Sequence, residues 1–328
     1  MGYEARRRLS PHGYRGLRLM RTLVVGAGAV GGYFGGRMLE AGRDVTFLVR
    51  PKRAQELAEG GLRIRSKFGD VTLSKPPVIL AANPGSAFDL VLLSAKAYDL
   101  AGAIAAFAPA VGPDTVILPL LNGMRHLEAL DDRFGPDRVL GGLCLIAATL
   151  NEQREIVHLN DAHAIAFGER SGMLSERVTS IDKLMDGARF DHRASLTILA
   201  DMWEKWVFLA TLAGATCLFR GTIGDIAAAP GGSDLVLALL EECKAIATAQ
   251  GYPPRQPFLD RTGPLLTAAG STLTASMLRD IEAGGPIEAD HIIGDLLARG
   301  GGRLLPIVYA HLKTYEMSRE GSRARACP

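Results

Sequence analysis

The first part of the chain alternates short apolar runs with helical stretches. Runs rich in Val, Leu and Ile, typical of strands buried on both faces of a sheet, recur at 22–25, 45–49, 88–94 and 115–121. Helices are expected from Val30 to Ala41, between the first two runs, and from Tyr98 to Ala108, between the last two. Strands that alternate with helices in this way predict a parallel sheet covered by helices.

Further strands are expected up to about residue 192, and after that the pattern becomes helical. Residues 62–80 alternate as a hairpin does, around the turn Phe68-Gly-Asp. Further strands are expected at 139–149, 155–159, 164–168 and 188–192, with a helix at 176–185. From Ser195 onward the pattern is helical, and helices are expected at 196–218, 235–250, 264–269, 286–299 and 304–317.

The pattern therefore predicts an α/β fold with an N-terminal Rossmann-type parallel sheet domain and a C-terminal all-helical domain. We expect the sheet domain to span 20–194 and the helical domain to span 195–317. Residues 1–19 are basic and lack the apolar stretch of a secretory signal, so they are expected to be a disordered N-terminal extension. Residues 318–328 are expected to form a flexible tail.

Composition narrows the function classes. The 328 residues are 48% hydrophobic and carry a formal net charge of only +2, which argues against nucleic acid or a membrane surface as a partner. No apolar run approaches the roughly 18 residues of a membrane span. The four cysteines are far apart, as expected for reduced thiols in a cytoplasmic protein, and no metal site is predicted. They are Cys144, Cys217, Cys243 and Cys327.

A glycine-rich turn follows the first strand. The residues are Gly26, Ala27, Gly28, Ala29, Val30 and Gly31, which spell G-x-G-x-x-G. The first glycine allows a tight turn, the second lets a pyrophosphate approach the backbone, and the third lets the next helix pack against the strand. The N-terminus of that helix points free N–H groups at the phosphates. We interpret this turn as a dinucleotide-binding site, and the alternative is a βα turn that binds nothing.

Three more polar residues follow strands of the predicted sheet. Arg50 ends the second strand, where an arginine favours the 2′-phosphate of NADP and an acidic residue would favour NAD. The alternative for Arg50 is a side chain that only faces solvent. Lys96 and Asn122 follow the next two strands, and either could be an ordinary loop or turn residue. Because ligands of parallel sheets bind at the carboxyl ends of strands, these residues and the glycine turn are expected to converge.

Several motifs in a fixed order resemble the ketopantoate reductase family, the NADP-dependent 2-dehydropantoate 2-reductases. They are Gly26-Ala-Gly-Ala-Val-Gly-Gly, Ser94-Ala-Lys-Ala-Tyr-Asp, Leu121-Asn-Gly-Met, Trp203-Glu-Lys-Trp, Ser276-Met-Leu-Arg-Asp and Ile287-Glu-Ala-Asp. The resemblance covers residues 20–317. It implies an oxidoreductase that transfers hydride from NADPH to a 2-oxo acid. The substrate it favours is 2-dehydropantoate, which is reduced to pantoate in pantothenate biosynthesis.

The resemblance also assigns roles to residues. It makes Lys205 the proton donor to the carbonyl oxygen and Glu288 its acidic partner. It implies that Ser276 and Asn122 bind the substrate, and that Lys96 and Asn122 bind the cofactor. The residues alone allow this for Lys205, because an ammonium on an apolar helix has a lowered pKa and gives up its proton more readily. The alternatives are a lysine with its head in water, a solvent-exposed Glu288 and an ordinary helix-start Ser276.

Three positions depart from the family pattern. Leu209, Ala213 and Ile293 stand where the family has asparagines, which predicts a more apolar pocket and leaves the natural 2-oxo acid open. Two other functions therefore stay in view: a D-2-hydroxyacid dehydrogenase of relaxed specificity, and a sensor that binds NADP(H) without catalysis. The helical domain is compatible with a homodimer.

Overall fold

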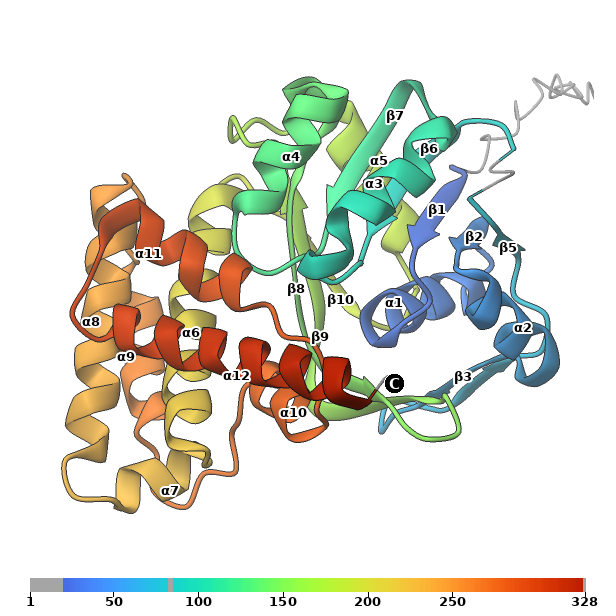
Figure 1. Cartoon of the computed structure of the whole chain (residues 1–328). Helices are drawn as coiled ribbons and strands as arrows, with labels where there is room; N and C mark the ends of the chain where they lie inside the picture. The colour runs from blue at the N-terminus through green and yellow to red at the C-terminus, as the bar shows by residue number, and fades with distance from the viewer. Residues whose placement is uncertain (1–19, 82–84, 327–328) are drawn as a thin grey trace, which may run out of the picture.

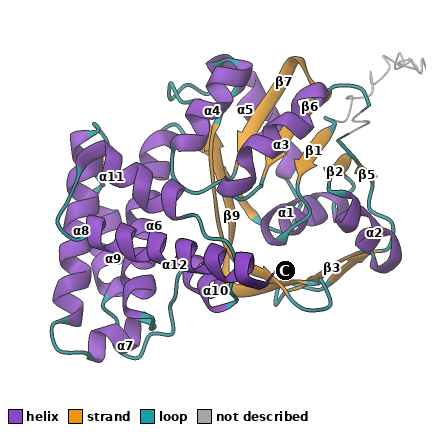
Figure 2. Ribbon diagram, viewed as in Figure 1, coloured by secondary structure: helices purple, strands orange, loops and turns teal. Residues whose placement is uncertain are grey.

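The computed structural model describes residues 20–81 and 85–326 (Figure 1). The expected N-terminal extension and Cys327 lie outside these residues. In the described part, a sheet domain is followed along the chain by a bundle of helices (Figure 2). The predicted fold class is confirmed.

Five parallel strands form the central sheet, in the order β5-β2-β1-β6-β7. Their bounds are β1 (Thr22–Val25), β2 (Val45–Leu48), β5 (Val78–Ile79), β6 (Phe88–Leu93) and β7 (Val111–Pro119). In the middle of the sheet, Thr22 pairs with Val45 on one side and with Leu90 on the other. Because all five strands run the same way, the residues that follow β1, β2, β6 and β7 gather at one edge, as predicted.

A second sheet, which the sequence pattern did not predict, faces the first. Its order is β10-β9-β3-β4, with β8 paired to β9. Its strands are β3 (Leu62–Arg65), β4 (Val71–Leu73), β8 (Gly141–Leu150), β9 (Ile156–Gly168) and β10 (Asp191–Ala194). The predicted hairpin is confirmed, since β3 and β4 pair antiparallel. The strands expected at 155–159 and 164–168 are one continuous β9, and the closing strand lies at β10 instead of 188–192.

Helix α1 (Ala29–Glu40) lies between the two sheets, and its glycines explain how closely it packs. A Cβ atom at Gly35 would lie 2.7 Å from the Phe47 ring of the parallel sheet. A Cβ atom at Gly36 would lie 2.8 Å from Leu62 of the second sheet. Larger side chains at either position would therefore force the layers apart.

The remaining helices of this domain cover its outer faces. They are α2 (Pro51–Gly60), α3 (Leu100–Phe107), α4 (Arg125–Phe134) and α5 (Glu176–Met185). Helix α5 has the bounds predicted for it, and α3 is close to its prediction, whereas α2 and α4 were not predicted. The apolar side chains of α3 and α4 pack with Leu23 and Ile117 of the sheet, and the same core continues into the helical bundle.

The helical bundle is built around α6 (Ile198–Phe219), which is buried on most of its faces. The other helices are α7 (Ile223–Ala228), α8 (Gly232–Ala249), α9 (Gln256–Leu266), α10 (Ser276–Glu282), α11 (Asp295–Gly300) and α12 (Leu305–Ala326). A π-helical turn, Asp290–Gly294, precedes α11. A long helix that is apolar all round belongs at the centre of a core, and that is where α6 lies.

Some helix predictions in this part were wrong. Helices α7 and α10 were not predicted, and α9 begins at Gln256 instead of Pro264 because Pro257 occupies its first turn. The last helix was expected to end at Met317, with a flexible tail from 318, whereas α12 runs to Ala326. The stretch after Met317 has Arg, Glu and Ala, which favour helix, and no proline before Pro328.

A cluster of charges fixes the start of α6 to the sheet domain. The Arg255 guanidinium donates hydrogen bonds to Glu204 (2.7 and 2.6 Å) and to Asp201, and Arg193 of β10 also donates to Asp201 (2.9 Å). Asp201 and Glu204 are buried. Burial opposes ionisation of Asp201, but the bonds from Ser195, Arg255 and Arg193 outweigh it and lower the pKa of this carboxyl.

Replacing Arg255 with methionine is expected to lower the free energy of unfolding by about 2 kcal/mol. The change leaves two buried carboxylates short of a donor, and the partial exposure of Arg255 keeps the loss below the range for fully buried pairs. Urea denaturation measures it. Arg261→Met is the control, because Arg261 is exposed and has no ion pair among the described residues. Equal stabilities of the two variants would show that the cluster contributes nothing.

Candidate active site

The glycine turn has the geometry of a dinucleotide-binding site. Gly26 has φ +95°, a conformation that favours glycine, and a Cβ atom at Gly31 would lie 2.1 Å from Ser94 Oγ and 2.2 Å from Gly26 O. Gly28, which caps α1, faces open space, with no atom within 4 Å of a Cβ built there. The chain therefore leaves room at the N-terminus of α1 for a phosphate group, and the residues present fit a dinucleotide.

Two arginines lie beyond β2 and differ in what they contact. Arg50 caps α2, keeps 76% of its side chain exposed and forms an ion pair of 2.7 Å with Asp99. Arg53 is largely buried, and its Nε donates to the carbonyl oxygen of Ala27 (3.0 Å) within the glycine turn. Arg50 thus has a free face for an incoming anion, whereas Arg53 supports the turn.

Lys96 and Glu288 come together although they belong to different domains. Lys96 Nζ donates to Asp280 Oδ2 (3.1 Å) and lies 3.6 Å from Glu288 Oε2. Glu288 Oε1 accepts from the backbone N–H of Ala97 (2.9 Å). Burial works against the charge on Lys96, but Glu288 and Asp280 outweigh it and raise the pKa of this lysine. Asp280 belongs to the motif Ser276-Met-Leu-Arg-Asp, but nothing in that motif indicates its contact with Lys96.

Lys205 lies in the middle of α6, between two tryptophans that point into the core. Burial lowers the pKa of its ammonium, while Cys144 of β8 and Glu288 act in the opposite direction. Among the residues that the structure describes, Lys205 Nζ has no hydrogen bond or ion pair. The predicted contact between Lys205 and Glu288 is therefore electrostatic in this structure, and the direct partners of Glu288 are Lys96 and Ala97.

Asn122 follows β7, and its surroundings contain two histidines that the sequence analysis did not select. The Asn122 backbone acts to raise the pKa of His291, against the effect of burial, and His291 Nε2 lies 3.4 Å from Nδ1 of His126. His126 is the second residue of α4, four residues after Asn122. Its contact with His291 joins two distant parts of the chain, so no local pattern in the sequence indicated it.

The remaining predicted positions belong to the helical domain. Ser276 is exposed at the start of α10, one turn before Asp280, and so lies on the same helix face. Ala213 and Ile293 are buried and Leu209 is partly buried. These three apolar side chains therefore offer no hydrogen bonds where the family pattern has amides.

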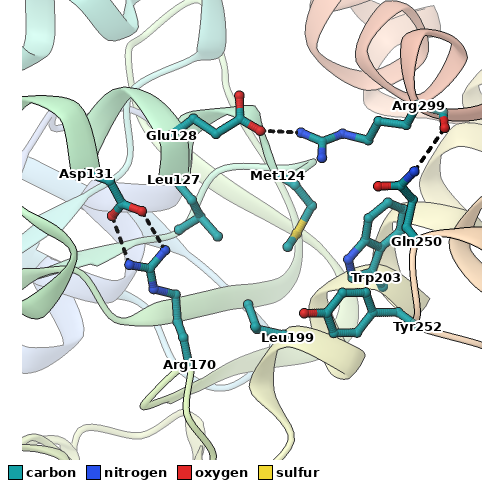
Figure 3. Close-up of a pocket in the computed structure, with 10 residues that line it drawn as sticks. All are labelled: Met124, Leu127, Glu128, Asp131, Arg170, Leu199, Trp203, Gln250, Tyr252 and Arg299. Carbon is teal, nitrogen blue, oxygen red and sulfur yellow. Dashed lines mark hydrogen bonds and ion pairs between the residues drawn. The ribbon is translucent and has the colours of Figure 1, made fainter.

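A separate cavity of about 270 Å³ lies on another part of the interface between the domains (Figure 3). Its charged side chains are already paired: Arg170 with Asp131 (2.8 and 2.9 Å) and Arg299 with Glu128 (2.7 Å). The Trp203 and Tyr252 rings stack on its wall, 5.6 Å apart. None of the predicted site residues lines this cavity.

The described residues offer neither a metal site nor a membrane span. No group of three or more His, Cys, Asp or Glu side chains in 20–81 and 85–326 is arranged to hold a metal ion. Within the same ranges, no helix has the length and apolar character needed to cross a membrane. Cys144, Cys217 and Cys243 are free and buried.

Comparison with protein families gives two matches that together cover most of the chain. Residues 22–172 match the model described as ketopantoate reductase PanE/ApbA. Residues 197–314 match the model of the C-terminal part of the same proteins. The stretch between the two matches, 173–196, contains α5 and β10.

Individual relatives match over nearly their full length. An uncharacterized oxidoreductase, YkpB of Bacillus subtilis (strain 168), is 38% identical over 90% of this chain and 99% of its own. The crystal structure of 2-dehydropantoate 2-reductase from Geobacter metallireducens GS-15 has a TM-score of 0.82 at 29% identity, over 90% and 99% of the two chains. D-mandelate dehydrogenase, solved with NADH and anilino(oxo)acetate, has a TM-score of 0.81 over 92% and 100%. At 18% identity it shares the fold.

Proposed function

This chain belongs to the ketopantoate reductase family of oxidoreductases, and from that premise we propose that it uses NADPH to reduce a 2-oxo acid to a 2-hydroxy acid. A nicotinamide cofactor follows from the family. The choice of NADPH, the substrate and the roles of individual residues are our proposal.

One observation carries the proposal. Lys205 has an ammonium without a partner among the described residues, at a place where burial lowers its pKa. Such an amine is ready to donate a proton to an oxygen that gains negative charge. Lys96 and Ala97 hold Glu288 nearby, so that a fixed carboxylate supports the charge on Lys205. A lysine that served only stability in this apolar setting would be expected to pair with a carboxylate.

Each residue of the site has a separate role in the proposed reaction. NADPH, when bound, supplies the hydride that reaches the keto carbon. The Gly28 backbone and the start of α1 hold the pyrophosphate, and Asn122 and Ser276 hydrogen-bond the substrate. Lys205 gives its proton to the carbonyl oxygen, and Glu288 keeps the ammonium protonated and oriented before that step.

The substrate that the family favours is 2-dehydropantoate, which would place the enzyme in pantothenate biosynthesis. The apolar side chains of Leu209, Ala213 and Ile293 favour a second candidate, a bulkier and more hydrophobic 2-oxo acid. That candidate corresponds to a D-2-hydroxyacid dehydrogenase of relaxed specificity on the same fold.

An absorbance assay with the purified protein tests the function. NADPH oxidation is followed with ketopantoate, pyruvate, 2-oxoisocaproate and phenylglyoxylate as separate substrates. We expect oxidation with at least one of them, and a preference for the last two would support the apolar pocket. Tight NADPH binding without oxidation by any acid would support a sensor and contradict a reductase.

Arg50→Asp is expected to weaken NADPH binding by roughly 10- to 100-fold and NADH binding much less, because a charge-assisted bond to the 2′-phosphate is lost. Asp99→Asn is the matched control, since it frees Arg50 from its ion pair and should leave NADPH binding unchanged or up to about fivefold tighter. Fluorescence titration measures both affinities. Equal losses for the two cofactors would reject the phosphate contact.

Compartment and assembly complete the proposal. Three free cysteines fit a reducing compartment, and we assign the protein to the cytoplasm. A homodimer is our proposal for its assembly. Sedimentation of the purified chain tests that state.

A further inference from the structure

Two histidines from different domains meet, and one of them interacts electrostatically with the predicted proton donor. His126 of α4 is fully buried, and its Nδ1 lies 3.4 Å from Nε2 of His291 in the π-helical turn. The other ring nitrogen of His126, Nε2, is buried without a hydrogen-bond partner. A buried polar nitrogen with no partner carries a free-energy cost, which calls for a group that pairs with it.

Lys205 is the group that matches this nitrogen. It interacts electrostatically with His126, and its ammonium also lacks a partner among the described residues. The charged or titratable groups that face the ammonium come from three other elements: Cys144 from β8, His126 from α4 and Glu288 from the segment before the π-helical turn. Of these, His126 is the one with an unpaired buried nitrogen.

We propose that His126 is a positioning residue for Lys205, and that its Nε2 accepts a hydrogen bond from the ammonium after a rotation of the lysine side chain. An ammonium only donates hydrogen bonds, so Nε2 must carry the lone pair and the ring proton must lie on Nδ1. That proton is then donated to His291 Nε2. The pair of rings thus selects one tautomer of His126 and holds it.

The surroundings of the pair are consistent with neutral rings. Burial lowers the pKa of His126 well below its ordinary value, and His291 and Lys205 lower it further. Burial also lowers the pKa of His291, although Glu288, the Asn122 backbone and Asp295 act in the opposite direction. A π-helical turn, which places His291 here, is a rare backbone form that is often found at functional sites.

This inference rests on the proposed role of Lys205. It gives the ammonium a hydrogen-bond acceptor in place of the asparagine amides that this chain lacks. The apolar side chains of Leu209, Ala213 and Ile293 offer Lys205 no hydrogen bond. His126 provides one from the sheet domain. The position of the ammonium then depends on both domains, because His291 holds the ring from the far side.

The test compares two variants that remove different parts of the ring. His126→Asn keeps a polar group near Nδ1 and lacks Nε2, whereas His126→Gln keeps an acceptor near Nε2. Trace acetylation of Lys205 with acetic anhydride, measured by mass spectrometry across pH, reports its protonation without any substrate. We expect the Gln variant to titrate as the unmodified chain does. The Asn variant should titrate about one pH unit lower, because the ammonium has lost a charge-assisted bond.

Two results would overturn the inference. One is an unchanged Lys205 titration in His126→Asn. The other is obtained on the unmodified chain, so that it does not depend on the folding of a variant: nitrogen NMR of labelled histidine showing the His126 proton on Nε2. If no 2-oxo acid is reduced but Lys205 titrates as expected, the proposed function fails while the pairing of His126 with Lys205 stands.

Discussion

Replacing Lys205 with alanine is expected to lower turnover by roughly 100- to 10,000-fold, the usual contribution of a positioned general acid. The physical reason is the loss of the proton donor at the carbonyl oxygen. NADPH affinity should barely change, because the residues that we propose to hold the cofactor, the glycine turn and Arg50, lie in the other domain. Turnover and NADPH titration are measured on the same preparation.

Lys205→Arg sharpens this test because it keeps the positive charge. A guanidinium does not give up a proton near neutral pH, so this variant should also be slow if proton donation is the role of Lys205. In the unmodified chain the rate should fall as pH rises through the lowered pKa of Lys205, because the protonated amine is the active form. Retained turnover in Lys205→Ala would remove this residue from the mechanism.

Replacing Gly31 with alanine is expected to lower the free energy of unfolding by about 3 kcal/mol and to weaken NADPH binding. The new Cβ would lie 2.1 Å from Ser94 Oγ and 2.2 Å from Gly26 O. The serine hydroxyl can move away, but the carbonyl belongs to the backbone of the turn. Relief of that clash must therefore displace α1 or distort the turn.

Gly28→Ala is the matched control for Gly31. Its Cβ would meet no atom within 4 Å, and its backbone conformation suits any residue. Stability should stay within about 0.5 kcal/mol, while NADPH binding falls because a methyl group enters the space left for a phosphate. Urea denaturation and NADPH titration separate the two effects. Equal stability losses at both glycines would contradict the assigned packing role of Gly31.

The sequence predicted the elements that local pattern determines. The glycine turn, the strands around it and helix α5 follow from runs of apolar residues and from the spacing of glycines. The second sheet was missed because β3 joins β9, about ninety residues later in the chain, and no local pattern records such a pairing. Helix α9 was misplaced because either of two prolines could start it.

In the candidate site, too, the features set by local pattern were predicted and those set by contacts between distant residues were not. The residues after strands β1, β2, β6 and β7 were expected at one edge, because parallel strands end together. Lys205 and Glu288 could be named only through the family resemblance, since an apolar helix with one lysine is ambiguous. His126 and Asp280 could not be assigned, because what each does depends on a contact with the other domain.

The buried thiols have a practical consequence for studies of unfolding. Burial raises the pKa of Cys217 and of Cys243 to about 12, and it also raises the pKa of Cys144. A thiolate-selective reagent should therefore label these positions only when the surrounding structure opens. With Cys327 changed to serine, brief labelling in rising denaturant would report the helical bundle through Cys217 and Cys243. Cys144 would report the wall beside Lys205, so that the chain carries its own probes of local opening.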